Sequence, residues 1–255
     1  MQGWAQLPRV RLMNKVAEIT FAFWVMKICA TTLGETAGDL LSMTLNVGYA
    51  LSTLILLGIF VATLIVQLTS RAFHPLLYWS VILSTSTAGT TMSDFMDRTL
   101  ELGYATGSLI LATLLIVVLA VWRWSVGTIS VSNIQSPRVE GFYWAAILVS
   151  NTLGTALGDY LADSSGLGFA GGAALIASVI AAIVAANYWT SLSRIALFWA
   201  AFVLTRPLGA TVGDLLTKTP EEGGLGFGTI GSSAVLAAVL LILIILTTRA
   251  HAKRP

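Results

Sequence analysis

The sequence predicts an all-α integral membrane protein of eight transmembrane helices, built from four parallel two-helix repeats. The chain of 255 residues is 56% hydrophobic and only 10% charged, whereas soluble domains contain about 25% charged residues. A pattern of tryptophan, glycine and aspartate recurs four times, and an apolar run long enough to cross a bilayer follows each copy. The composition therefore indicates a chain surrounded by lipid, and the recurrence indicates repeats.

Four segments align without gaps, and in each of them a tryptophan precedes an aspartate by fifteen residues. The pairs are Trp24–Asp39, Trp79–Asp94, Trp144–Asp159 and Trp199–Asp214. A glycine follows each tryptophan by ten residues, at Gly34, Gly89, Gly154 and Gly209. Self-similarity of this kind indicates a repeated structural unit. We expect one membrane domain over residues 1–255, with repeats at 18–69, 73–125, 138–189 and 193–248.

Each repeat is predicted to contain two spans, because a second apolar run of about twenty residues follows each aspartate. These second runs open at Gly48, Gly103, Gly168 and Gly226. The expected spans are 19–41, 48–68, 76–97, 103–124, 141–162, 167–188, 195–217 and 226–248. Two spans per repeat make the repeats parallel. They form either a pseudo-fourfold ring or two pseudo-twofold halves divided by the longer link at residues 125–140.

The distribution of Lys and Arg predicts the orientation, because cytoplasmic loops are enriched in these residues. The loops inside repeats contain only Arg98 and Lys218. The termini and the links between repeats contain Arg9, Arg11, Lys15, Arg71, Arg123, Arg138, Arg194, Arg249, Lys253 and Arg254. We therefore expect both termini in the cytoplasm, and we interpret the four repeated tryptophans as anchors at that interface.

A polar face is predicted on the first helix of each repeat, because positions eight, eleven and fifteen after the tryptophan have helical spacing. In chain order this face contains Thr32, Glu35 and Asp39; Thr87, Thr90 and Asp94; Thr152, Thr155 and Asp159; and Pro207, Ala210 and Asp214. Ionised aspartates facing lipid would be costly. We therefore expect the four aspartates to converge inside the protein, with the structural alternative that each caps a helix or bonds to a turn.

Three charged residues distinguish the repeats from one another. Lys27 lies in the first span, Arg206 lies in the seventh, and Glu35 has no acidic counterpart. Five carboxylates against Lys27 and Arg206 predict a site with a net charge of −3 when all groups are ionised. Such a site would attract a cation or hold shared protons. In the alternative interpretation, Lys27 and Arg206 pair with two of the aspartates and lock the bundle.

The ligand types narrow the chemistry of this site. Carboxylates and hydroxyls are hard oxygen donors that suit Mg²⁺, Ca²⁺, Mn²⁺, Na⁺ or protons better than Cu(I) or Zn²⁺. Cys29 is the single cysteine, so the sequence predicts no internal disulfide and no cysteine-based zinc site. The net charge of +2 gives no argument for a nucleic-acid partner. No resident cofactor and no catalytic residue are predicted.

The four tryptophans and the four Gly-x-x-x-[Gly/Ser]-Asp ends resemble a bacterial membrane-protein family of unknown function that is defined by this repeat. The resemblance covers about residues 18–248 and implies no particular activity. Separately, "ETAGD" at Glu35–Asp39 is similar to the Glu-x-Gly-Asp motif of a family of cation exchangers linked to manganese and calcium. The spacing here is one residue longer, and the match occurs once.

These features predict a bacterial inner-membrane transporter of a hard cation, a divalent metal such as Mn²⁺, coupled to protons. The acidic site would contain Asp39, Asp94, Asp159, Asp214 and Glu35. Thr32, Thr87 and Thr152 would add ligands or relay protons, and Lys27 and Arg206 would set the resting charge. The alternatives are a pseudo-tetrameric channel with an aspartate ring, a metal-dependent membrane enzyme, and a structural or sensory membrane protein. The expected partners are membrane lipid, the cation and, in a homo-oligomer, further copies of the chain.

Overall fold

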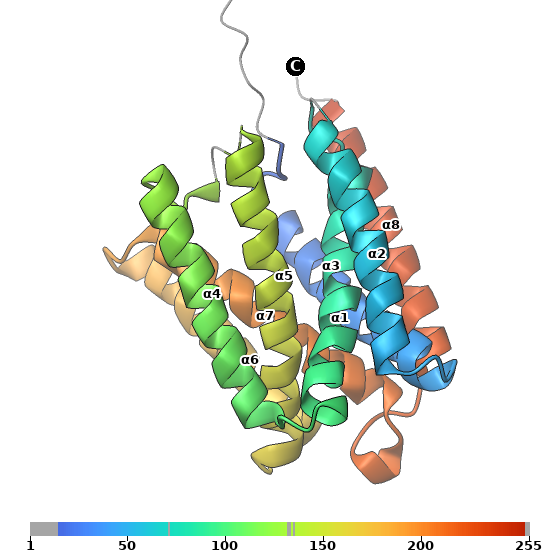
Figure 1. The fold of residues 1–255 in the computed structure, drawn as a ribbon. Coiled ribbons are helices and arrows are strands. Elements are labelled where there is room, and N and C mark those ends of the chain that lie inside the picture. The colour runs from blue at the N-terminus through green and yellow to red at the C-terminus, as the bar shows by residue number, and fades with distance from the viewer. Residues whose placement is uncertain (1–14, 71, 132–133, 135, 253–255) are drawn as a thin grey trace, which may run out of the picture.

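The computed structural model describes residues 15–252 except 71, 132–133 and 135, and these described residues form helices and no strands. The long helices are α1 (Phe21–Asp39), α2 (Tyr49–Thr69), α3 (Pro75–Asp94), α4 (Tyr104–Val126), α5 (Pro137–Asp159), α6 (Gly168–Trp189), α7 (Arg194–Thr217) and α8 (Thr229–Ala252). Figure 1 shows them as one bundle. The predicted spans and the observed helices agree to within a few residues.

Local sequence determines where the first helix of each repeat begins. The side chains of Thr20, Ser136 and Ser193 cap α1, α5 and α7, each accepting a hydrogen bond from the backbone N–H three residues later. This bond satisfies one of the donors that a helix start leaves unpaired. α3 begins with Pro75, whose missing N–H is not needed at the first helical position.

The first three repeats share a π-helical turn directly after their repeated aspartate. These turns are η1 (Leu40–Thr44), η2 (Phe95–Thr99) and η4 (Tyr160–Ser164). The next helix is then entered through a glycine with positive φ, 79° at Gly48 and 71° at Gly103, a conformation that side chains other than hydrogen disfavour. The fourth repeat differs: α7 continues to Thr217, and the short 3₁₀ helix η5 (Pro220–Glu222) follows.

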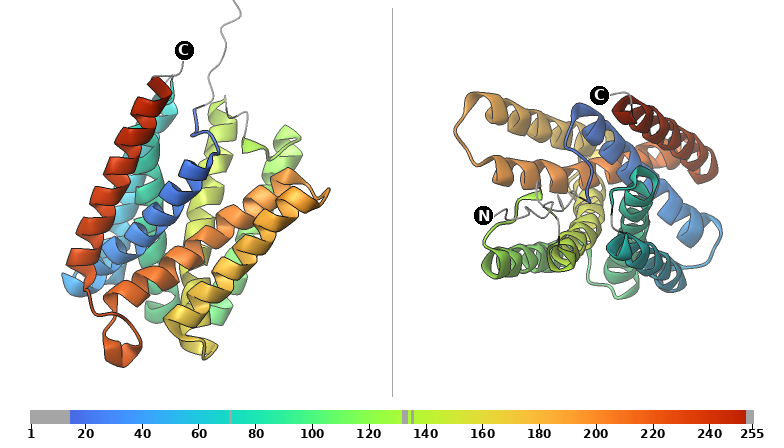
Figure 2. Two further views of the ribbon diagram at one scale, coloured as in Figure 1. Left: turned by 180° about the vertical axis from the view of Figure 1, so that it is seen from behind. Right: turned by 90° about the horizontal axis from the view of Figure 1, so that it is seen from above.

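The first helices of the four repeats form a closed ring in the middle of the bundle. α1 contacts α3, α3 contacts α5, α5 contacts α7, and α7 contacts α1 again. The second helix of each repeat packs on the first helix of the following repeat: α2 on α3, α4 on α5, α6 on α7, and α8 on α1. The view from above in Figure 2 shows α2, α4, α6 and α8 around the outside.

The repeated glycines lie at the four ring interfaces, where they allow the core helices to approach closely. Each one faces the residue seven positions after the tryptophan of the next repeat: Gly34 faces Ser86, Gly89 faces Asn151, Gly154 faces Arg206, and Gly209 faces Thr31. A Cβ at Gly34, Gly154 or Gly209 would overlap its neighbour, and a Cβ at Gly89 would lie 3.0 Å from Asn151, closer than an ordinary van der Waals contact. Small residues are a common way for membrane helices to pack at short distance. The same contact therefore recurs around the ring, as the pseudo-fourfold arrangement predicts.

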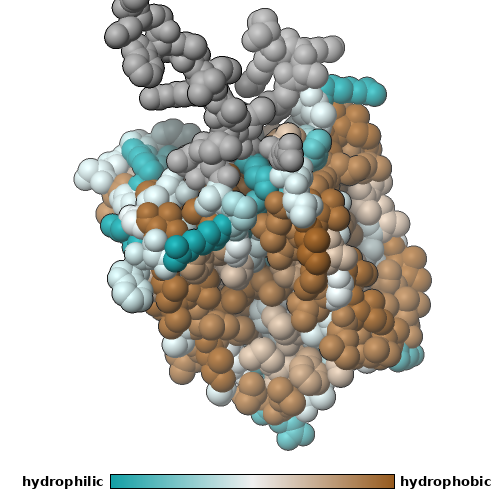
Figure 3. All heavy atoms as spheres, turned by 45° about the horizontal axis from the view of Figure 1, so that its top comes forward, coloured by the Kyte–Doolittle hydropathy of each residue, from teal (hydrophilic) through white to brown (hydrophobic). Residues whose placement is uncertain are grey.

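The outer surface of the bundle is largely apolar, as expected for a protein surrounded by lipid. Five helices, α2, α4, α6, α7 and α8, are long and apolar enough to cross a bilayer. The exposed large hydrophobic residues are concentrated on the outer helices, with Leu54, Leu109 and Ile116 each about two-thirds exposed or more. Hydrophobic residues cover the sides of the molecule in Figure 3, and hydrophilic residues gather at its ends. The chain therefore has the surface of a membrane protein.

The bundle has two distinct ends. The C-terminal end of α8 and the start of α1 lie at one of them, which we call the terminal end (Figure 1). α1, α3, α5 and α7 run from there to the opposite end, where their aspartates lie and which we call the aspartate end. Among the basic residues that predict the orientation, Arg9, Arg11, Arg71, Lys253 and Arg254 lie outside the described residues.

The ring contacts predict that a larger residue at an interfacial glycine destabilises the fold. A Cβ at Gly89 would lie 3.0 Å from the backbone of Asn151, which cannot rotate away. Gly89→Leu should therefore lower stability by about 1–3 kcal/mol or more, measured as a lower thermal unfolding midpoint in detergent. Gly58→Leu is the matched control, because Gly58 on α2 is exposed and has open space around it. Equal midpoints for the two variants would contradict the packing described.

Candidate functional site

The side chains that line the middle of the ring occupy every fourth position after each tryptophan. At seven residues they are Thr31, Ser86, Asn151 and Arg206; at eleven, Glu35, Thr90, Thr155 and Ala210; at fifteen, the four aspartates. All twelve are buried. Four residues of helix rise about 6 Å, so these sets form three successive layers between the middle of the bundle and the aspartate end.

Arg206 lies at the centre of the ring, because it contacts a residue from each of the other three core helices. Its Nη2 lies 2.8 Å from Glu35 Oε2, 2.6 Å from Thr90 Oγ1 and 2.6 Å from Thr155 Oγ1. The ion pair with Glu35 is almost completely buried. Ala210 is the fourth residue at the level of Glu35, and Arg206 enters this level from the preceding turn of the same helix. The charged pair therefore blocks the axis of the ring.

The arginine is not fully satisfied by these contacts. Its Nε and Nη1 have no hydrogen-bond partner among the described residues. Buried polar atoms without partners are uncommon in native proteins and usually indicate an unseen water or ligand. The level of Arg206 therefore contains two buried donors that could bind an additional polar group.

Lys27 lies further from the aspartates, closer to the terminal end. It is completely buried, with its ammonium 3.4 Å from Asn151 Oδ1 and 4.3 Å from the centre of the Phe202 ring. Asn151 in turn donates to Thr85 Oγ1 at 2.9 Å. Lys27 has no ion pair with a described carboxylate. Neither it nor Arg206 pairs with an aspartate, so the alternative in which they lock the bundle through two aspartates is wrong.

The four aspartates are paired instead by Arg98 and Lys218, the two basic residues that the sequence predicts in the loops inside repeats. Arg98 lies 2.9 Å from Asp94 and 3.5 Å from Asp159. Lys218 lies 3.0 Å from Asp39 and 3.3 Å from Asp214. Each base follows the aspartate of its own repeat by four residues, which is a spacing that brings side chains together on a helix. That spacing was the signal that could have identified them.

Arg98 and Lys218 change the charge of the site. With them, five carboxylates face four cationic side chains, so the expected net charge of −3 becomes −1 when all groups are ionised. Lys218 follows the last residue of α7. Burial lowers the pKa of its ammonium, but the carboxylates of Asp214 and Asp39 together outweigh burial and raise that pKa above its ordinary value. The two carboxylates therefore favour the charged form of the lysine in this position.

Three of the carboxylates lie close enough to share one ion. Glu35, Asp39 and Asp214 each offer an oxygen, and these oxygens lie within 4.8 Å of one another. A divalent cation binds oxygen at about 2.0–2.6 Å, so a single ion between them could contact all three. Asp94 and Asp159 lie at the same level on α3 and α5 and complete the acidic layer.

The threonines at position eight do not point to this layer. The hydroxyls of Thr32, Thr87 and Thr152 donate to backbone carbonyls three or four residues earlier on their own helices. The hydroxyls that reach the centre belong instead to Thr90 and Thr155. The predicted polar face is therefore rotated toward positions seven and eleven.

The repeated tryptophans are packed inside the bundle, which corrects their interpretation as interfacial anchors. Trp79, Trp144 and Trp199 are buried, and Trp24 is half-buried. They form edge and tilted ring contacts with neighbouring Phe and Tyr residues at the terminal end of the core helices. Aromatic side chains of this size fill the space between helices efficiently.

A buried polar cluster closes the terminal end on one side. Lys15 lies 2.7 Å from Glu140 and donates to the backbone carbonyls of Gln67 and Leu68. The amide of Gln67 donates to the other oxygen of Glu140 at 3.0 Å. This cluster joins the segment before α1 to the end of α2 and the start of α5, and it lies apart from the acidic layer.

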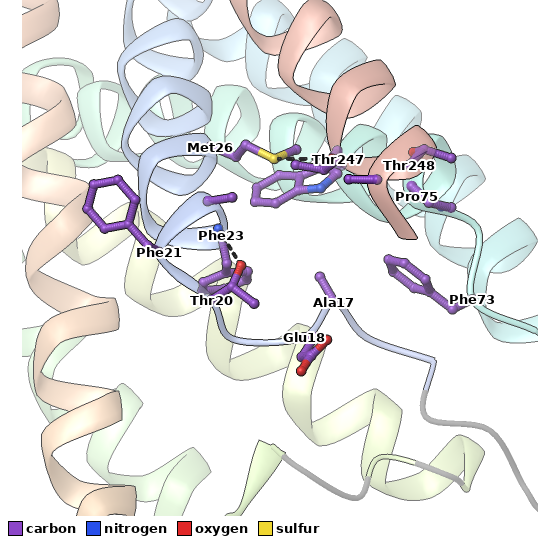
Figure 4. Close-up of a pocket in the computed structure, with 13 residues that line it drawn as sticks. Ala17, Glu18, Thr20, Phe21, Phe23, Met26, Phe73, Pro75, Thr247 and Thr248 are labelled. Atoms are coloured by element: carbon purple, nitrogen blue, oxygen red, sulfur yellow. Dashed lines mark hydrogen bonds between the residues drawn. The ribbon is translucent and has the colours of Figure 1, made fainter. Parts of the chain in front are cut away.

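An apolar pocket at the terminal end is a separate feature. It has a volume of about 440 Å³ and lies between the start of α1, the start of α3 and the end of α8. Figure 4 shows Phe21, Phe23, Met26 and Phe73 around it, with Glu18 near the chain that enters α1. Glu18 is the one carboxylate among its lining residues, so this pocket has no cluster of oxygen donors comparable to the aspartate end.

The central ion pair gives a stability prediction. Arg206→Met leaves Glu35 buried without its cation, which should cost about 3–5 kcal/mol. Arg206→Met combined with Glu35→Met removes both charges, and should recover most of the loss because no unpaired charge remains. Thermal unfolding midpoints of the two single variants and the double variant form the cycle that measures this coupling. Additive losses would show that the pair does not interact as described.

Comparison with known proteins identifies the repeat. The family described as Repeat of Unknown Function (DUF347) matches the chain four times, over residues 22–73, 77–128, 142–193 and 197–253. No curated protein and no solved structure matches the chain. The four matches confirm the resemblance to a tandem-repeat family of unknown function. Because they cover most of the sequence, the chain belongs to the DUF347 repeat family.

Proposed function

We propose that this protein transports a hard cation, a divalent metal such as Mn²⁺, across a bacterial inner membrane in exchange for protons. The observation that supports this proposal most directly is the buried acidic layer, to which every repeat contributes one aspartate and the first repeat adds Glu35. Carboxylate oxygens are the donors that hard divalent cations prefer. Ionisable residues inside a membrane domain commonly mark ion or proton pathways.

The position of Arg206 favours a carrier over a channel. A channel requires a continuous path along its axis, whereas here the guanidinium lies across the axis and contacts three helices. Arg98 and Lys218 lie over the aspartates, with side chains 34% and 18% exposed. The acidic layer is therefore closest to solvent at the aspartate end, where a cation would enter.

The proposal requires all eight helices to cross the membrane. α1, α3 and α5 are less apolar than the other five, but most of their charged and hydroxylated side chains are buried in the protein. Burial in protein is what allows a spanning helix to contain such residues. With both termini in the cytoplasm, the aspartate end faces outward. Membrane lipid would surround the outer helices.

Proton exchange is supported by the polar residues that continue inward from the acidic layer. Glu35, Thr90, Thr155 and Arg206 occupy the next level, and Asn151, Thr85 and Lys27 follow. Buried carboxylates and hydroxyls in sequence can relay protons in transporters. The aromatic residues at the terminal end close this route in the conformation described.

Purified protein in liposomes tests the proposal. A Mn²⁺-quenched dye inside the vesicles reports metal entry, and a pH-sensitive dye reports proton exit. Asp39→Asn removes one of the three clustered carboxylates at nearly constant shape, and should reduce the initial rate by about tenfold or more, because ligand charge sets affinity for such ions. Asp163→Asn is the control, because Asp163 is an exposed acid just beyond the acidic layer, and its rate should equal that of the wild type.

The outcomes separate the candidate functions. Saturable metal entry accompanied by proton exit supports exchange, whereas stepwise single-channel current in a planar bilayer would favour a channel. Folded protein that moves none of Mn²⁺, Mg²⁺, Ca²⁺ or Na⁺ under either gradient would contradict the transport proposal. Equal rates for the Asp39 and Asp163 variants would show that the acidic layer is not the transport site.

A further inference from the structure

We propose that the cation binds on the Lys218 side of the ring, among Glu35, Asp39 and Asp214, and that Lys218 is a tethered cation that it must displace. The inference rests on the proposed function in taking the acidic layer as the cation site. It adds which half of the layer binds the ion and which group competes with it.

The ammonium of Lys218 already occupies the place of an ion. It lies 3.0 Å from Asp39 and 3.3 Å from Asp214, on two different helices of the ring. Both carboxylates are more than nine-tenths buried. Asp214 Oδ1 accepts no hydrogen bond from a described residue, although the ammonium lies near it. The site therefore contains a cation and an acceptor oxygen whose hydrogen-bonding capacity is not used.

The opposite half of the acidic layer also has one basic residue between two aspartates, but it has no third carboxylate. Arg98 joins Asp94 and Asp159 there, as Lys218 joins Asp39 and Asp214. The neighbouring residues at position eleven are Thr90 and Thr155, whereas Glu35 takes that position beside Lys218. Within the part of the chain that the structure describes, the group of three acids spaced for one ion lies on the Lys218 side.

The two basic residues also differ in the chemistry of their charged groups. Arg98 has a planar group with two carboxylate partners and the Tyr104 ring at 5.6 Å. A guanidinium of this kind is suited to fixed, directional contacts, whereas a lysine ammonium is a point charge on a flexible stem. Lys218 therefore releases its partners more readily than Arg98 does.

The backbone at Lys218 is fixed, so displacement needs only the side chain to move. Its N–H donates to Asp214 O at 2.8 Å, and its carbonyl accepts from Gly226 N at 2.9 Å. α7 ends at the residue before Lys218. The π-helical turn that follows the first helix in the other three repeats does not occur here. The side chain is partly exposed at the aspartate end and can swing into solvent as the cation enters.

The competition predicts tighter cation binding when Lys218 loses its charge. Lys218→Met is a mild replacement, because Met43 occupies the equivalent position in the first repeat. Mn²⁺ binding to the purified protein, measured by electron paramagnetic resonance or calorimetry, should strengthen by about tenfold or more. Arg98→Met removes the same charge from the opposite half of the layer and should strengthen binding less, while Lys218→Arg keeps the competing charge and should not strengthen it. An unchanged or weaker affinity for Lys218→Met, or equal tightening by Arg98→Met, would overturn the inference.

A second measurement uses the wild-type protein and does not depend on a variant folding. Water-soluble acetylating reagent, followed by mass spectrometry, reports the accessibility of each lysine. Saturating Mn²⁺ should increase labelling of Lys218 severalfold, because the cation expels the ammonium into solvent. Labelling of buried Lys15 should stay constant. Lys218 labelling that is unaffected by Mn²⁺ would contradict displacement.

Failure of this inference can be told apart from failure of the transport proposal. If the protein moves metal in liposomes but Lys218→Met does not bind Mn²⁺ more tightly, the transport proposal is supported and the proposed role of Lys218 is wrong. Binding with displacement of Lys218, but without flux in any vesicle, would leave the binding site standing and remove transport.

Discussion

The close approach of the four core helices determines what the interior of this protein can contain. Gly34, Gly89, Gly154 and Gly209 bring each helix against the next, so side chains at the centre touch partners from more than one repeat. Without that proximity, Arg206 could not reach Glu35, Thr90 and Thr155 together. A buried charge in a membrane domain is tolerated only with such partners, so the packing of small residues and the presence of charges depend on each other.

The backbone and the charges follow different symmetries. The glycine contacts recur at all four interfaces, whereas the described basic residues that pair with aspartates come from the second and fourth repeats. Glu35 and Arg206 reduce the symmetry further, because each occurs in one repeat. The ring thus has fourfold packing, roughly twofold pairing at the aspartate end and a unique central pair. One half of the acidic layer consequently differs in chemistry from the other.

The repeat, its two helices and the interior location of the aspartates were predictable, because they follow from recurrence and hydropathy. The rotation of the polar face was not, since positions seven and eight differ by 100° on a helix and the sequence contains hydroxyls at both. Thr31 and Thr32 are adjacent residues of the same type, so the sequence does not distinguish them. In the structure Thr31 lies at the α1–α7 interface, where it donates to the carbonyl of Thr205. The tryptophans misled because membrane interfaces and membrane-protein interiors both favour them. Counting Lys and Arg in each loop indicates the orientation of the chain but not the direction of a side chain. The pairing of Lys218 and Arg98 with the aspartates therefore could not be seen from that count.

The packing of α8 on α1 has a consequence for the order in which the chain is made. Every outer helix covers the core helix of the following repeat, so the helix that covers α1 is the last one synthesised. α1 contains Lys27, Glu35 and Asp39, and two of its three helical neighbours, α7 and α8, emerge from the ribosome at the end. The core helix with the most buried charged residues is thus the one that waits longest for its partners. The first repeat must stay incompletely packed until the fourth repeat closes the ring around it.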